Sequence, residues 1–191
     1  MLALDPRTTA LVLIDLQKGV LAMPLAPHGA AQVVQNAARL GLHFDEVGAV
    51  VALVHVAFSA NVVDRLSQPV DAPPSPGGLP ADWADFAPEI GSLHADIIIT
   101  KRQWGAFHGT ELDLQLRRRG INTIVLAGVA TNFGVESTAR EAWQHNYAVV
   151  VAEDAVTSVG EDLHKFAIDK VLPRIARVRT TAEIVGALPA V

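Results

Sequence analysis

The chain has 191 residues, of which half are apolar and only 18% are charged, so it can bury one sizeable core. Its formal net charge of −5 argues against nucleic acid and anionic membranes as partners. The absence of cysteine excludes disulfides, thiolate metal sites and a cysteine nucleophile. The longest apolar run, near residues 49–58, is too short to span a membrane, and no signal peptide is visible, so we expect a cytoplasmic protein.

The first part of the chain predicts two strands around one helix. Residues 9–15 and 49–56 are continuous apolar runs, typical of strands buried on both faces. Between them, apolar residues recur at three- and four-residue steps over residues 29–47, which predicts a helix. Asp15 ends the first run. An aspartate there is commonly a loop cap, but the position also suits an acid at the ligand-binding edge of a sheet.

Residues 58–90 have a different composition and hold six of the eleven prolines. They predict a long segment without regular structure, including the proline-rich run at residues 71–78. A loop of this length in a compact domain is more often functional or in contact with another subunit than idle. Trp83 and Phe86 could anchor it to the core or to a partner subunit, and packing is the simpler interpretation.

A third strand is expected at residues 96–100, and Lys101 follows it directly. A lysine just past a buried strand is usually solvated. Here the same sheet edge would also carry Asp15, which favours a functional interpretation. Trp104 and Phe107 come next and are close enough to wall a pocket.

The stretch at residues 121–145 is the most informative part of the chain. The apolar run at residues 124–127 predicts a buried strand, and a turn of small residues then leads into a helix with Thr131 or Asn132 available as N-cap. Gly134 is unusual there, because glycine costs a helix roughly 1 kcal/mol relative to alanine. Close approach of a ligand to the backbone and close helix–strand packing explain it equally well.

The remaining elements are read from capping and termination signals. We expect a helix from Thr110 to the arginines before Gly120, a strand at 148–152, a helix capped by Ser158 and Glu161 that ends at Leu172 before Pro173, a strand at 175–179, and a helix capped by Thr180 and Glu183. The alternation of these elements with the earlier strands predicts a mostly parallel sheet with helices on both faces.

Known cofactor and metal motifs are absent from the sequence. There is no G-x-G-x-x-G after the first strand, no P-loop and no G-x-S-x-G. The seven histidines are scattered, without H-x-H or H-E-x-x-H. We therefore expect no cofactor and no metal.

Three sequence blocks at the expected strand ends resemble the isochorismatase-like hydrolase family. LVLIDLQKG contains Asp15, TKRQWGAFHGTELDLQLRRRGI contains Lys101 and LAGVATNFGVESTAREAW contains Gly134, while AEDAVTS and LPRIARVRT extend the likeness over nearly the whole chain. The resemblance implies one domain over residues 1–191, a three-layer α/β/α sandwich with a six-stranded, mostly parallel sheet, and a homo-oligomer (dimer or tetramer). It also implies a non-proline cis peptide between Val129 and Ala130.

The resemblance assigns roles to individual residues. Amidase members use an aspartate and a lysine, matched by Asp15 and Lys101, and a cysteine, whose position is held here by Gly134. Backbone N–H groups of Ala130 and Gly134 would form an oxyanion site. Metal-dependent nicotinamidases of the family carry an Asp-x-His pair after the second strand, whereas this chain has only His55 within that strand.

The missing thiol decides between the family's mechanisms. The covalent amidase route is ruled out, whereas isochorismatases also carry glycine at this position. Their reaction splits an enol ether: an acid protonates the vinyl carbon, and water attacks the resulting cation. We expect Asp15 to be this general acid, with Lys101 holding and polarising it or the substrate carboxylate. Burial would raise the pKa of Asp15 and Lys101 would lower it, and the sequence leaves the outcome open.

Two functions remain. The first is a cysteine-independent hydrolase acting on a small carboxylated or carbonyl-containing molecule, with an isochorismate-type enol ether as first guess, although no arginine clamp is evident. The second is an inactive family member that binds or scaffolds a small molecule. A catalytically inactive site would not require a buried charge pair, so the pair favours the hydrolase. The expected substrate-binding walls, for which packing alone is an equal explanation, are Gln17, Trp104, Phe107, Ala130, Asn132 and Phe133.

Overall fold

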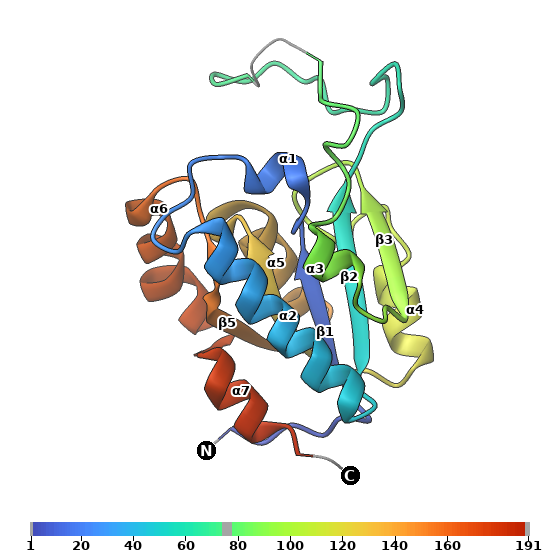
Figure 1. Cartoon of the computed structure of the whole chain (residues 1–191), viewed down its shortest axis with the longest axis vertical. Coiled ribbons are helices and arrows are strands. Elements are labelled where there is room, and N and C mark those ends of the chain that lie inside the picture. The colour runs from blue at the N-terminus through green and yellow to red at the C-terminus, as the bar shows by residue number, and fades with distance from the viewer. Residues whose placement is uncertain (1, 74–77, 190–191) are drawn as a thin grey trace.

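The computed structural model describes residues 2–73 and 78–189, across which six parallel strands form one sheet in the order β3-β2-β1-β4-β5-β6 (Figure 1). Every residue of β1 and all but the first of β4 are buried, as their uninterrupted apolar sequences predict. The strands are β1 (Thr9–Ile14), β2 (Val50–Val56), β3 (Ile97–Lys101), β4 (Thr123–Val129), β5 (Ala148–Thr157) and β6 (Arg177–Arg179).

Helices cover both faces of this sheet, which confirms the expected three-layer α/β/α fold. One core cluster joins the sheet to α2 (Ala30–Glu46), α3 (Pro88–Gly91) and α7 (Thr181–Ala187). A second cluster on the other face includes α4 (Leu112–Arg118) and α5 (Glu136–Gln144). The other elements are α1 (Lys18–Leu21), η1 (Thr131–Val135), α6 (Glu161–Phe166), η2 (Ala167–Val171) and η3 (Leu172–Arg174).

Strand β5 is longer than expected. The strand was predicted to stop before residues 153–154, but it continues to Thr157 through a register irregularity opposite Leu126 and Gly128. The carboxylate of Asp154 accepts hydrogen bonds from the backbone N and Oγ1 of Thr181, at 2.6 and 2.8 Å. Because this acid serves the start of α7, its polarity does not mark a strand end.

Two predicted helix caps are wrong. Helix α6 begins after Gly160 without a side-chain cap, and Ser158 Oγ instead donates to Asn132 Oδ1. Neither Thr131 nor Asn132 caps the helix after β4, because η1 begins after Ala130 and both side chains bond to residues distant in sequence. Tertiary partners have replaced the local backbone as hydrogen-bond partners of these side chains.

The last helix agrees with its sequence signal. Thr180 and Glu183 form the predicted capping box of α7. The preceding helical segment ends at Arg174, two residues later than expected, because Pro173 is accommodated in the first turn of the 3₁₀ helix η3.

The proline-rich segment before α3 contains more order than predicted. Pro88 lies in the first turn of α3, a position that tolerates proline, so irregular structure does not extend to residue 90. Trp83 and Phe86 pack against the core cluster on the α2 face, which confirms the packing interpretation. Figure 1 shows this segment projecting from the same end of the sheet as α1. Of the predicted irregular run, residues 74–77 lie outside the described residues.

None of the helices in residues 2–73 and 78–189 combines the length and the apolar character that crossing a bilayer requires.

Candidate functional site

Three segments meet at the carboxyl edge of the sheet. Asp15 follows β1, Lys101 is the last residue of β3, and the turn after β4 begins with the cis peptide bond between Val129 and Ala130. Central strand β1 pairs with β2 on one side and β4 on the other, so the direction of the strand order changes here. Such a switch point is where open α/β sheets bind ligands.

Asp15 and Lys101 form a buried ion pair at this edge. Lys101 Nζ lies 2.7 Å from Asp15 Oδ2, and the two residues are only 2% and 6% exposed. Lys101 Nζ also donates to the carbonyl oxygens of Gln103 and Trp104, at 3.1 and 2.7 Å. An ammonium group has three N–H donors, and all three have acceptors within the protein. Lys101 therefore holds Asp15 and the following loop in place.

The second carboxylate oxygen of Asp15 has a different environment. Asp15 Oδ1 is buried and has no hydrogen-bond partner among the described residues. Burial raises the pKa of Asp15 to about 6, although Lys101 acts in the opposite direction. Desolvation thus outweighs the ion pair, and the proton that Asp15 holds below this pKa can reside on Oδ1.

The turn after β4 brings Gly134 against Asp15. A Cβ atom on Gly134 would lie 3.1 Å from Asp15 Oδ2, so a side chain at this position would start beside the carboxylate. The turn itself is the π-helix η1, a form that is frequent at functional sites. Gly128, just before it, has φ +124°, and a Cβ atom there would be 1.9 Å from the carbonyl oxygen of Ile14. Only glycine lets β4 approach β1 in this way.

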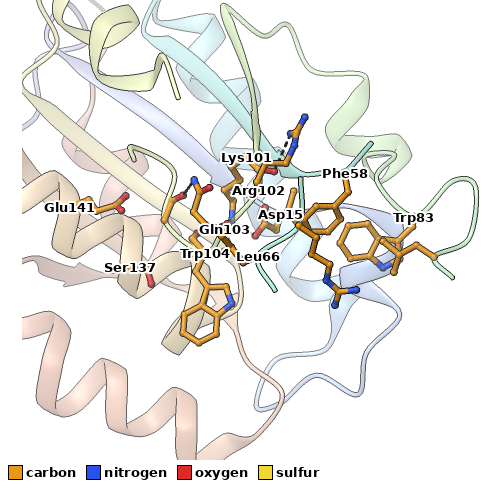
Figure 2. A pocket seen from close by; sticks show the side chains of 14 residues that line it. Asp15, Phe58, Leu66, Trp83, Lys101, Arg102, Gln103, Trp104, Ser137 and Glu141 are labelled. Carbon is orange, nitrogen blue, oxygen red and sulfur yellow. Dashed lines mark hydrogen bonds and ion pairs between the residues drawn. The ribbon is translucent and has the colours of Figure 1, made fainter. Parts of the chain in front are cut away.

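The carboxylate lies in the wall of a cavity of about 600 Å³, a size suited to a small organic molecule. Figure 2 shows Asp15 and Lys101 at its centre, with Phe58 and Trp83 on one side and Trp104 on the other. Phe58 and Trp83 stack with ring centroids 6.3 Å apart. The other lining residues are Val56, Arg65, Leu66, Leu79, Arg102, Gln103, Gly105, Ser137 and Glu141.

The expected wall residues have different locations. Trp104 lines the cavity and packs against Phe133, with ring centroids 4.7 Å apart. Phe133 and Ala130 are not themselves among the cavity-lining residues. Gln17 is fully buried, and its amide bonds to the backbone of Val56 and Trp83. Phe107 is in the core cluster of the α5 face and stacks on His145 and Tyr147. Asn132 accepts from Ser158. Gln17, Phe107 and Asn132 thus have packing or positioning contacts and are not among the cavity-lining residues.

Sequence reasoning missed five polar residues of the lining, namely Arg65, Arg102, Gln103, Ser137 and Glu141. Arg65 and Arg102 supply two cations at a site for which the sequence showed no clear arginine clamp. Ser137 and Glu141 follow Gly134 by three and seven residues, the spacing of one helix face, which could have identified them. The arginines have no comparable signal, because Arg65 lies in the irregular segment.

Side chains behind the turn fix the first residues of η1. Thr131 Oγ1 and His164 Nδ1 are 2.9 Å apart, and both residues are buried. Burial, assisted by nearby His28, lowers the pKa of His164 to about 4, so its imidazole is neutral at neutral pH.

Comparisons with known proteins agree with this geometry. An isochorismatase domain matches residues 9–183. The chain is 50% identical over 188 residues to YecD, an uncharacterised isochorismatase family protein of Escherichia coli O157:H7, covering 98% of this chain and 100% of that protein. It is 49% identical over 184 residues to the uncharacterised isochorismatase family protein YwoC of Bacillus subtilis (strain 168), covering 95% of each.

Solved structures of isochorismatase family proteins also resemble this chain. An isochorismatase family protein from Burkholderia thailandensis has a TM-score of 0.93 at 45% identity, with 98% of both chains covered. N-carbamoylsarcosine amidase from Thermoplasma acidophilum has a TM-score of 0.69 at 26% identity, covering 91% of this chain and 96% of that one. The chain described here belongs to the isochorismatase family of hydrolases.

Proposed function

We propose that this chain hydrolyses a small carboxylated molecule without a covalent enzyme intermediate, with Asp15 as general acid and Lys101 as its positioning residue. One observation carries the proposal: a buried carboxylate in the cavity wall, with Oδ2 held by Lys101 and Oδ1 without a hydrogen-bond partner among the described residues. A pKa of about 6 lets Asp15 donate a proton near neutral pH. The absence of cysteine removes the thiol route.

For an enol ether substrate, the chemistry needs only these groups and water. Asp15 Oδ1 transfers its proton to the vinyl carbon, which leaves a cation stabilised by the ether oxygen. Water attacks that cation and returns a proton to Asp15, and the resulting hemiketal breaks into a carbonyl compound and an alcohol. The Asp15 carboxylate, once ionised, lies close to the developing positive charge. Lys101 keeps its contacts throughout.

The cavity lining supports a carboxylated substrate with a planar part. Arg65 and Arg102 are cations that can pair with carboxylates, and Arg65 also lies over the Phe58 ring at 5.6 Å. Trp83 and Trp104 offer flat apolar surfaces. Isochorismate is the first candidate of this class. Amides, the substrate type named for N-carbamoylsarcosine amidase, would require direct attack by water in this chain.

The test is a hydrolysis screen of the purified protein against isochorismate, related enol ethers and small carboxylated amides. We expect turnover of at least one enol ether, falling by at least about a hundredfold in Asp15→Asn because the proton donor is lost. Asp45→Asn is the matched control, since Asp45 is a surface carboxylate whose one ion pair among the described residues is with His94, and it should leave turnover unchanged. Circular dichroism checks that both variants fold.

Other outcomes contradict the proposal. Turnover retained in a folded Asp15→Asn variant would remove Asp15 from the chemistry. Silence of the wild-type protein on every substrate, while one of them raises its melting temperature, would instead identify the chain as a small-molecule binding protein.

A further inference from the structure

A second cluster of chemically reactive side chains lies apart from the cavity. His28 comes from the loop before α2, Glu153 from β5 and His164 from α6, and one potential ligand atom of each lies within 4.8 Å of the other two. None of the three lines the cavity around Asp15. The cluster therefore has no role in the chemistry proposed above.

The donor types suit a metal ion, and His28 and Glu153 are spaced nearly as two ligands of one ion would be. His28 Nε2 and Glu153 Oε1 are 3.7 Å apart, too far for a hydrogen bond. Ligand atoms of a tetrahedral zinc ion, bound at 2.0–2.2 Å, are about 3.3–3.6 Å from one another. His28 Nε2 is buried and has no hydrogen-bond partner among the described residues, a costly arrangement that a metal would relieve.

Both histidines also have support on the other side of the ring. A ligating imidazole usually binds the metal through one nitrogen and hydrogen-bonds through the other. Thr131 Oγ1 lies 2.9 Å from His164 Nδ1, and the Gln32 amide lies 3.2 Å from His28 Nδ1. The Gln32 amide can turn its carbonyl oxygen toward Nδ1 when that nitrogen carries the proton. The backbone of His28 is held as well, because its carbonyl oxygen accepts from Thr157 Oγ1 at 2.7 Å.

We propose that His28, Glu153 and His164 bind one divalent transition-metal ion of the zinc type, with water completing the coordination. Two imidazoles and one carboxylate suit zinc, and the partial exposure of Glu153 gives an ion access from solvent. The ion would tie together three separate elements, namely the loop before α2, β5 and α6. It would also brace Thr131, the first residue of η1, and so the turn that holds Gly134 against Asp15.

The site could not be recognised from the sequence. Metal motifs place ligands a few residues apart on one element, whereas His28 lies 125 positions before Glu153, and Glu153 and His164 belong to different elements. The fold brings the three together from the loop before α2, from β5 and from α6. The expectation of no metal rested on the missing motifs, and the proposal replaces it.

The experiment is a calorimetric titration of Zn²⁺ into tag-free protein that has been dialysed against a chelator. We expect one equivalent to bind, and Kd to rise by at least about tenfold in His28→Ala and in Glu153→Gln. His94→Ala is the matched control, because His94 also pairs with a carboxylate, Asp45, at 2.9 Å, but has no third metal-binding group beside it in residues 2–73 and 78–189. Its Kd should equal that of the wild type. A Co²⁺ titration followed by visible absorption should give the bands of a tetrahedral site.

Three results would overturn the proposal. They are no stoichiometric Zn²⁺ binding by the wild type, an unchanged Kd in both ligand variants, and a loss of Zn²⁺ affinity in His94→Ala as large as that in the ligand variants. Circular dichroism reports whether each variant folds. If His28→Ala does not fold, the milder Glu153→Gln substitution decides the outcome alone.

Discussion

Asp15 combines two features that oppose each other. Its Oδ2 accepts from Lys101 at 2.7 Å, which stabilises the ionised form, while burial without a partner on Oδ1 stabilises the neutral form. The protein stabilises the neutral form more than the ionised form, since the pKa of Asp15 is raised to about 6. A single side chain can thus be held in one orientation by an ion pair and still carry a proton near neutral pH.

The pH dependence of turnover follows from this raised pKa. A general acid acts in its protonated form, so kcat/KM should be constant below pH 6 and fall about tenfold for each pH unit above it. The measurement is kcat/KM against pH for the substrate found in the screen, together with a carboxyl ¹³C titration in which Asp15→Asn assigns the signal. A profile that rises through pH 6 would show that Asp15 acts as a base and would contradict the acid role.

The residues at the centre of the site could be predicted because their positions follow from the sheet. Asp15 follows β1 and Lys101 ends β3, and parallel strands bring such ends to one edge. The walls could not be predicted in this way. Gln17 and Phe107 are near Asp15 and Lys101 in sequence, but their side chains point into packing contacts that depend on the final fold. Arg65 reaches the cavity from an irregular segment without periodicity.

At the scale of elements, apolar runs were reliable and local polar signals were not. Strands such as β1 and β4 were found because burial on both faces requires continuous apolar sequence. In the part of the chain that the structure describes, the Thr180 hydroxyl bonds only to Glu183 and the capping box forms, whereas Ser158 bonds to Asn132 instead of capping α6. A capping sequence predicts a cap only where tertiary structure leaves the side chain available.

The close contact between β1 and β4 at Gly128 leads to a prediction about stability. Gly128→Ala would place a Cβ atom 1.9 Å from the carbonyl oxygen of Ile14, in a backbone conformation that L-residues rarely adopt. We expect the free energy of unfolding to fall by at least about 3 kcal/mol, because backbone of a central strand must move. Urea denaturation followed by circular dichroism measures the change.

The variant Gly120→Ala separates the steric contact of the added Cβ atom from the cost of the positive φ. Gly120 also has a positive φ, of +72°, but an added Cβ would meet nothing within 4 Å. This variant should lose only about 1–2 kcal/mol, the cost of the left-handed conformation alone. Equal losses in the two variants would show that the close approach of the strands adds nothing.

On the scale of the whole molecule, the cavity exists because the segment after β2 meets the sheet edge. Phe58, Arg65 and Trp83 come from this segment, and Lys101 and Trp104 come from the end of β3 and the loop beyond it. The α/β sandwich supplies the rigid side of the cavity, and the segment supplies the other. Substrate preference should therefore depend on how firmly the segment is attached.

Asp64 is the clearest point of attachment. Its Oδ2 accepts from Arg102 Nε at 2.6 Å, and its Oδ1 accepts from the backbone N and Oγ of Ser59, both at 2.8 Å. The hydrogen bonds from Ser59, followed by that from Arg102, lower the pKa of Asp64 to about 2, so it is an anion at neutral pH. One carboxylate thus closes the loop at residues 59–64 and ties it to a cavity residue.

Asp64→Asn should loosen this loop without changing the chemistry at Asp15. We expect faster amide hydrogen exchange at Ser59, a rise in KM of less than about tenfold because a partly exposed ion pair contributes little, and a nearly unchanged kcat. Asp45→Asn, which removes a surface carboxylate far from the cavity, controls for the change in net charge. A fall in kcat with constant KM would instead mean that Arg102, once released from Asp64, disturbs the reacting groups directly. The attachment would then belong to the catalytic geometry rather than to substrate binding.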